Sequence, residues 1–114
     1  MDPAAQKRLS YVDAAEAALL DLGPDFDAAG LKALRAVVAG YPDTGDQGAG
    51  EVAASLFMLL ERLIADARMD HEAVAIHLRA WRLLTTTEPD QEAATVLIQG
   101  LKAVRNHSTL PKAA

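Results

Sequence analysis

Two histidines and the acid between them are the residues of this chain whose types suggest metal chemistry. His71-Glu72 is followed by His77, whereas the helical zinc motif needs two histidines four residues apart so that both rings face one ion. The six-residue spacing found here places the two rings about 240° apart around a helix. The sequence therefore predicts no metal site, and no cofactor is expected.

His77 has a second interpretation that depends on its neighbours. On a helix it shares a face with Val74, Leu78 and Trp81. A histidine on an apolar face is typical of a packed, hydrogen-bonded core or rim residue more often than of an acid–base group. His107, near the end of the chain, is expected to be exposed to solvent.

A glycine-rich break runs from residue 41 to residue 50, with glycines at 45, 48 and 50 and Gly40 just before it. It contains no lysine, arginine, histidine, serine or cysteine, so it lacks the Lys-Ser/Thr pair that ends a nucleotide-binding P-loop. A calcium loop starting at Asp43 fails as well, because its twelfth position is Ala54 and not a bidentate glutamate. The break is predicted to be a connector.

Trp81 is the single tryptophan, and Arg79 and Arg82 flank it. The pattern favours a core position for the indole and a solvated helix face for the arginines. An exposed indole edge would instead make Trp81, with the two arginines, an anchor for a protein partner.

Composition and charge exclude several function classes. The chain has 114 residues, 16 acidic against 11 basic side chains, and no cysteine. The net charge of −5 opposes binding to nucleic acid, and the absence of cysteine removes disulfides, thiolate zinc sites and thiol catalysis. No apolar run approaches the ~18 residues of a membrane span, and the first residues do not form a signal peptide. We therefore expect a cytoplasmic protein that does not contact a membrane.

No spacing suggests a Ser/His/Asp set or a paired-carboxylate site, so no enzyme activity is expected.

Five helical segments and no strand are predicted from the apolar periodicity. The first spans about residues 3–22 and ends at Gly23-Pro24. Asp25 or Asp27 caps the second, which stops at Gly40. The third follows the break and has the most regular apolar stripe, formed by Val52, Leu56, Leu59, Leu60, Leu63 and Ile64. Asp70 caps the fourth, and Thr87, with Asp90 three residues on, caps the fifth.

Short connections between these segments predict antiparallel neighbours, and hence an all-α, up-and-down bundle of four to five helices. The first helix is the candidate for an added piece packed across the end of the others. Residues 1–107 are predicted to form one domain, and 108–114 a short flexible tail.

Several stretches resemble bacterial histidine-phosphotransfer (HPt) domains. Residues 48–61 are similar to the helix that follows the active histidine in that family, residues 76–84 to the next helix, and residues 96–104 to the last. Ala39-Gly-Tyr-Pro42 is similar to a Gly-Tyr-Pro turn of the family. Together the resemblance covers about two-thirds of the chain.

The family motif His-x-x-Lys-Gly is missing. One alignment places the histidine position at Arg35 and the lysine position at Val38, and the other places them at Gly30 and Ala33. The resemblance therefore implies a degenerate, non-catalytic module that binds a receiver or histidine-kinase domain as a regulator or adaptor in bacterial two-component signalling. Two alternatives stay open: an active phosphotransfer protein that uses His77, which would require an exposed imidazole near a cation, and a homo-oligomeric structural bundle such as a homodimer.

Overall fold

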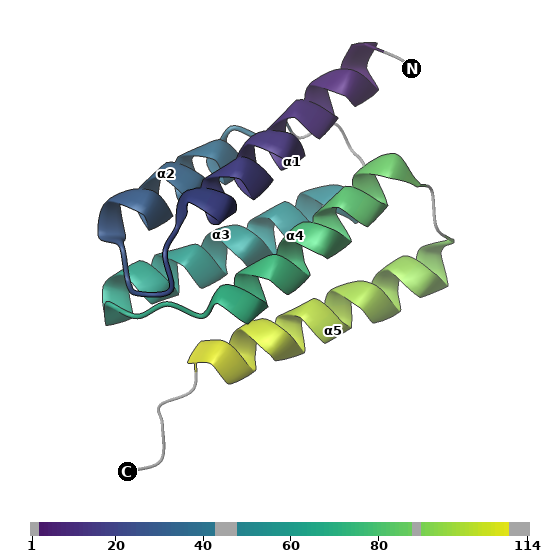
Figure 1. Ribbon diagram of the computed structural model, residues 1–114. Helices are drawn as coiled ribbons and strands as arrows, with labels where there is room; N and C mark the ends of the chain where they lie inside the picture. Colours follow the sequence, from purple (N-terminus) through teal and green to yellow (C-terminus); the bar gives the residue numbers. More distant parts are fainter. Residues whose placement is uncertain (1–2, 43–47, 88–89, 110–114) are drawn as a thin grey trace.

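The computed structural model describes residues 3–42, 48–87 and 90–109, and every regular element within these ranges is an α-helix (Figure 1). The elements are α1 (Pro3–Asp21), α2 (Ala28–Ala39), α3 (Ala49–Asp66), α4 (His71–Thr86) and α5 (Gln91–Thr109). The all-α prediction is confirmed, and the number of helices agrees with it. Over the same ranges, no helix has both the length and the apolar run that crossing a bilayer requires.

Four of the helices form a closed ring, and the fifth lies outside it. α1 packs on α2, α2 on α3, α3 on α4, and α4 back on α1, while α5 packs on α3 and α4. Successive helices run in opposite directions, with α1 and α2 on one side of α3 and α4, and α5 on the other side (Figure 1). The expectation that the first helix is the added piece is wrong: α1 closes the ring, and α5 is the addition.

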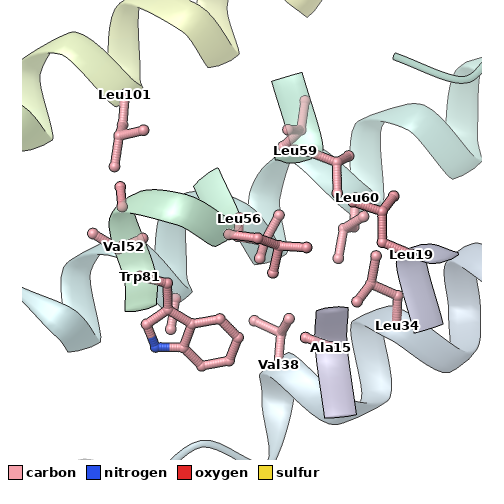
Figure 2. Packing of buried hydrophobic residues seen from close by; sticks show 14 of the residues in the cluster. Ala15, Leu19, Leu34, Val38, Val52, Leu56, Leu59, Leu60, Trp81 and Leu101 are labelled. Atoms are coloured by element: carbon pink, nitrogen blue, oxygen red, sulfur yellow. The ribbon is translucent and has the colours of Figure 1, made fainter. Parts of the chain in front are cut away.

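Like α4, which packs on α1, α3 and α5, α3 contacts three neighbours, in its case α2, α4 and α5. Its predicted apolar stripe is confirmed, with all of its members fully buried except Ile64, which is partly buried. Figure 2 shows Leu56, Leu59 and Leu60 of this stripe close to Leu34 of α2 and Leu19 of α1. Each buried leucine contributes roughly 1.5–3 kcal/mol relative to an exposed one, so this stripe is a large part of what holds the ring together.

Aspartates begin three of the helices. A carboxylate oxygen accepts from the backbone N–H three residues on in each case: Asp27 from Gly30 at 3.0 Å, Asp70 from Ala73 at 3.1 Å and Asp90 from Ala93 at 2.7 Å. The prediction for Asp70 is confirmed, and Asp27 is the cap of the second helix.

The prediction that Thr87 caps the fifth helix is wrong. Thr87 follows the last turn of α4, and its hydroxyl donates back to the Leu83 carbonyl at 2.6 Å. The backbone N–H of Thr87 donates to the same carbonyl at 2.9 Å, so Thr87 ends α4, and Asp90 is left to cap α5. Pro89 lies outside the described residues.

Gly48 leads into α3 with φ of 105°, a conformation that side chains with a Cβ rarely adopt. A Cβ added there would also lie 3.1 Å from Cδ1 of Leu84. The end of the glycine-rich break therefore needs glycine for a backbone reason. Residues 43–47, the middle of the predicted connector, lie outside the described part of the chain.

The predicted boundary between domain and tail is too early. α5 continues to Thr109, and Ser108 is buried with its hydroxyl donating to Asp70 at 2.6 Å. This contact joins the last turn of α5 to the first turn of α4, so residue 108 belongs to the folded domain. Residues 110–114 lie outside the described ranges.

Candidate functional site

His77 lies where α4 faces α3 and α5, and its side chain is 0% exposed. Its Nδ1 is 2.9 Å from the carbonyl oxygen of Ala73, and its Nε2 is 3.0 Å from Oγ of Ser55 on α3. Because a carbonyl can only accept, Nδ1 carries the proton and donates. Nε2 is then the acceptor for the Ser55 hydroxyl.

Arg105 on α5 completes this polar cluster. Its Nη1 donates to Oγ of Ser55 at 3.2 Å and lies 3.6 Å from Sδ of Met58, a weak acceptor. The hydrogen bonds therefore run in one direction, from Arg105 to Ser55, from Ser55 to His77, and from His77 to the backbone of α4. We call these three side chains the Ser55–His77–Arg105 cluster; it joins α3, α4 and α5.

The environment keeps the imidazole neutral. Burial lowers the pKa of His77, the bond to the Ala73 carbonyl raises it, and the positive charge of Arg105 lowers it, with a net lowering from the ordinary value of 6.5. Both ring nitrogens are occupied. In this conformation no lone pair of the ring is open to a phosphoryl group, so the geometry does not favour the alternative in which His77 is the phosphoacceptor.

A serine hydroxyl bonded to a histidine is also the first half of a nucleophilic site. Here Ser55 is only 2% exposed, and a backbone carbonyl rather than a carboxylate orients the imidazole. A substrate has no path to the hydroxyl in this conformation. The arrangement is that of a satisfied buried polar network, which fixes how three helices pack.

The core position that the sequence favours for Trp81 is confirmed, because the indole is 0% exposed, and the other interpretation, an exposed anchor for a partner, is wrong. Figure 2 shows it among Val38, Val52 and Ala15. The Tyr41 ring packs on it edge to face, with centroids 5.1 Å apart, and the Tyr11 ring packs on Tyr41 at 6.0 Å.

The two flanking arginines differ. Arg82 reaches across to α1, where its Nε donates to Glu16 at 3.1 Å and a terminal nitrogen pairs with both Asp13 and Glu16. Hydrogen bonds from Arg82 to Glu16 and then to Asp13 raise the pKa of the guanidinium. Arg82 therefore ties α4 to α1, while Arg79 is exposed and stays available to a partner.

The two histidines considered for a metal do not meet. His71 is exposed at the start of α4, whereas His77 is buried. Within the ranges that the structure covers, no three His, Cys, Asp or Glu side chains lie close enough to hold a metal ion.

Two hollows lie on either side of the outer face of α3. The α2–α3 groove, about 560 Å³, is lined mainly by apolar side chains, among them Tyr41, Pro42, Ala54, Phe57 and Met58. The Arg105 pocket, about 420 Å³, lies between α3 and α5 and is lined by Met58, Glu61, Arg62, Ala65, Arg105 and Asn106.

The sequence interpretation did not identify Ser55 and Arg105. A signal for Ser55 exists, since it stands one residue before Leu56 on the buried side of the most regular stripe, where a polar side chain needs a partner. Nothing in the spacing shows that this partner would come from residues 77 and 105.

Comparison of the chain with protein-family models, with curated proteins and with solved structures finds no match.

Proposed function

We propose that this chain is a non-catalytic helical interaction module, HPt-like in shape, that regulates or adapts bacterial two-component signalling in the cytoplasm by binding a receiver or histidine-kinase domain. The resemblance of residues 48–61, 76–84 and 96–104 to HPt helices supports the choice of partner. The antiparallel bundle is compatible with it.

The observation that carries the proposal is the α2–α3 groove. Met58 at its edge is 54% exposed, and Phe57, Pro42 and Tyr41 are partly exposed beside it. An apolar side chain of a partner would remove this surface from water, at roughly 25 cal/mol per Å² buried. Glu51 also lines this groove, and apolar residues beside charged ones are typical of a protein-binding surface.

The non-catalytic part of the proposal is supported by the buried cluster. His77, which shares this cluster with Arg105, has both ring nitrogens hydrogen bonded. The positions that align with the HPt histidine are Arg35 or Gly30, and neither can accept a phosphoryl group.

Binding is tested by titrating the protein into a panel of purified receiver and histidine-kinase dimerisation domains, with calorimetry as the readout. Ala54→Glu places a charged side chain in the groove and is expected to weaken binding by about tenfold or more. Ala17→Glu, at an exposed position of α1, is the matched control and is expected to change affinity less than about twofold. Failure of every domain to bind, or equal loss in both variants, would refute the proposal.

Catalysis is tested by incubating the protein with a phosphorylated receiver and assaying acid-labile, base-stable label. We expect none on this chain. Label that disappears in His77→Ala would establish the phosphotransfer alternative instead.

A further inference from the structure

We propose that the Arg105 pocket is a binding site for a carboxylate, with the Arg105 guanidinium as its principal ligand. This inference goes beyond the proposed function and does not rest on it, because it concerns the hollow between α3 and α5 and not the α2–α3 groove.

The first argument is that Arg105 has unused binding capacity. The guanidinium has five N–H donors in a planar fork, and the bonds that Arg105 makes to Ser55 and Met58 both come from Nη1. Among residues 3–42, 48–87 and 90–109, the structure shows no carboxylate paired with Arg105 and no hydrogen bond from its other nitrogens. Arg105 is partly buried, and charge-assisted hydrogen bonds to an anion are among the strongest that a guanidinium makes. Arg105 is one of the residues that line the pocket.

The second argument is that the guanidinium is held in place before any ligand arrives. Its Nη1 rests on the hydroxyl of Ser55, and that hydroxyl is itself fixed by Nε2 of the fully buried His77. Serine and neutral histidine satisfy the donor without neutralising the charge. A preorganised cation of this kind loses little conformational entropy when it binds.

The rest of the lining favours a singly charged, planar anion with an apolar stem. Arg62 adds a second cation, 3.5 Å from Asp66, and Glu61 adds an acid 3.8 Å from Arg35. Arg62 and Arg105 carry two positive charges and Glu61 one negative charge, so the residues that line the pocket carry a net charge of about +1. A carboxylate matches both this charge and the flat fork of Arg105, whereas a phosphate of about −1.5 to −2 charge would be repelled by Glu61. Met58 and Ala65 provide contact for the carbon chain.

Binding of an anion in the pocket should change the pKa of His77. The groups that face the imidazole are Ser55 from α3, Arg105 from α5 and the Ala73 carbonyl from its own helix. The positive charge of Arg105 lowers the pKa of His77. A carboxylate on Arg105 would offset that charge, so the pKa of His77 rises when the pocket fills.

The test is an NMR titration of the full chain with sodium acetate, with chloride adjusted to keep ionic strength constant. We expect saturable shifts at the Arg105 side chain and at Asn106, and an upward shift of the His77 titration midpoint at saturation. Arg105→Met is expected to weaken binding by at least about tenfold, because a charge-assisted bidentate contact is lost. Arg105→Lys keeps the charge but loses the fork, so it should also bind more weakly than the parent. Lys102→Met, at an exposed position on the same helix, is the matched control and should bind acetate as the parent does.

Two further titrations distinguish a partner's acidic side chain from a small free acid, and a carboxylate from a phosphate. N-acetyl-glutamate N-methylamide stands for an acidic side chain of a protein: tighter binding than acetate identifies a partner's side chain as the ligand, and equal binding identifies a small free acid. Inorganic phosphate that binds more tightly than acetate would overturn the choice of carboxylate.

Shifts that do not saturate, or a folded Arg105→Met or Arg105→Lys that binds like the parent, would overturn the site itself. Unfolding curves establish which variants are folded. Loss of receiver binding with acetate binding intact would refute only the proposed function.

Discussion

A serine in the middle of a leucine-rich helix is one of the residues that hold α5 in place. Ser55 is buried in the run that contains Leu56, Leu59 and Leu60, and its hydroxyl both donates to His77 and accepts from Arg105. Each member of this cluster is therefore hydrogen bonded to another. Buried polar groups cost little when paired and much when one partner is removed.

Ser55→Ala should destabilise the protein by about 1–3 kcal/mol, because it leaves Nε2 of His77 buried without a partner and takes one acceptor from Arg105. Urea unfolding followed by circular dichroism measures the loss. Ser10→Ala removes an exposed hydroxyl bond to the Lys7 carbonyl and serves as control, with an expected effect within about 0.5 kcal/mol. Equal effects at the two serines would show that the cluster does not stabilise the fold.

Acid should weaken the fold through His77 before it acts through Asp70. The pKa of His77 is lowered from 6.5 in the folded state, so as the pH falls the unfolded chain takes up this proton first. The contribution is fully present above 6.5 and is lost as the pH drops from 6.5 towards the folded-state pKa, with a slope of at most about 1.4 kcal/mol per pH unit.

Asp70 acts at lower pH. Burial raises its pKa, but hydrogen bonds from Ser108 and Ala73 and the charges of Arg68 and His107 outweigh burial, so the pKa is lowered from 3.8 and its contribution disappears only below that value. Unfolding free energies measured between about pH 7.5 and 5 should therefore fall for the parent and stay flatter for His77→Gln. An unchanged slope in His77→Gln would contradict the assignment.

The burial of apolar residues was predictable from the sequence, whereas the partners of the buried polar side chains were not. The stripe from Val52 to Leu63 follows from helical periodicity alone, and so does the preference of Trp81 for the core. The pairing of Ser55 with His77 and Arg105 joins positions 22 and 50 residues apart. Which helices meet at that point is decided by how the bundle closes, and local sequence does not contain that information.

Among the helices, α3 is flanked at both ends by a residue with positive φ. The residue before the helix is a glycine, which adopts positive φ easily, and the residue after it is an alanine, which does not. Gly48 precedes the helix with φ of 105°, and Ala67 follows it with φ of 53°. Gly48→Ala should be destabilising by more than about 1 kcal/mol, because it adds backbone strain and brings a Cβ to 3.1 Å from Leu84.

Ala67→Gly should have the opposite sign. It relieves the left-handed strain at the helix end, and we expect a gain of about 0.5–1 kcal/mol after the entropy cost of the added glycine. Thermal and urea unfolding of the two variants test the pair. Destabilisation by Ala67→Gly would mean that the gain in the folded state is smaller than the loss in the unfolded chain.

Helix ends show the limit of prediction from local signals. Asp70 was predictable because one strong cap stands before a clear apolar pattern, and it accepts from Ala73 as expected. At the fifth helix two strong caps, Thr87 and Asp90, stand close together, and the choice between them depends on which one the preceding helix uses. The end of α5 was missed because Ser108 looks like a tail residue until the Asp70 carboxylate is placed beside it.

For the whole molecule, the ring of four helices should resist local opening more than the added fifth. α3 contacts three helices and contributes most of the fully buried leucines, while α5 packs on α3 and α4 from outside the ring. Native-state hydrogen exchange should show amides in the middle of α3 exchanging only through global unfolding, and those of α5 through a smaller opening with a lower free energy. Equal free energies in the two helices would mean that ring and addition unfold as one unit.

The position of α5 also bears on the order in which the helices pack. The contacts among α1–α4 need no residue of α5, since the closing contact of the ring joins α4 to α1, so the ring can form before α5 docks. Until then, the Ser55–His77 pair lies on the side of the ring that α5 later covers, where water can serve both polar groups. Docking of α5 then exchanges that water for the guanidinium of Arg105 and the Ser108–Asp70 bond. The last helix thus covers a polar edge of the ring. Before α5 docks, this edge exposes hydrogen-bonding groups, and such a surface aggregates less readily than one made of exposed leucine side chains.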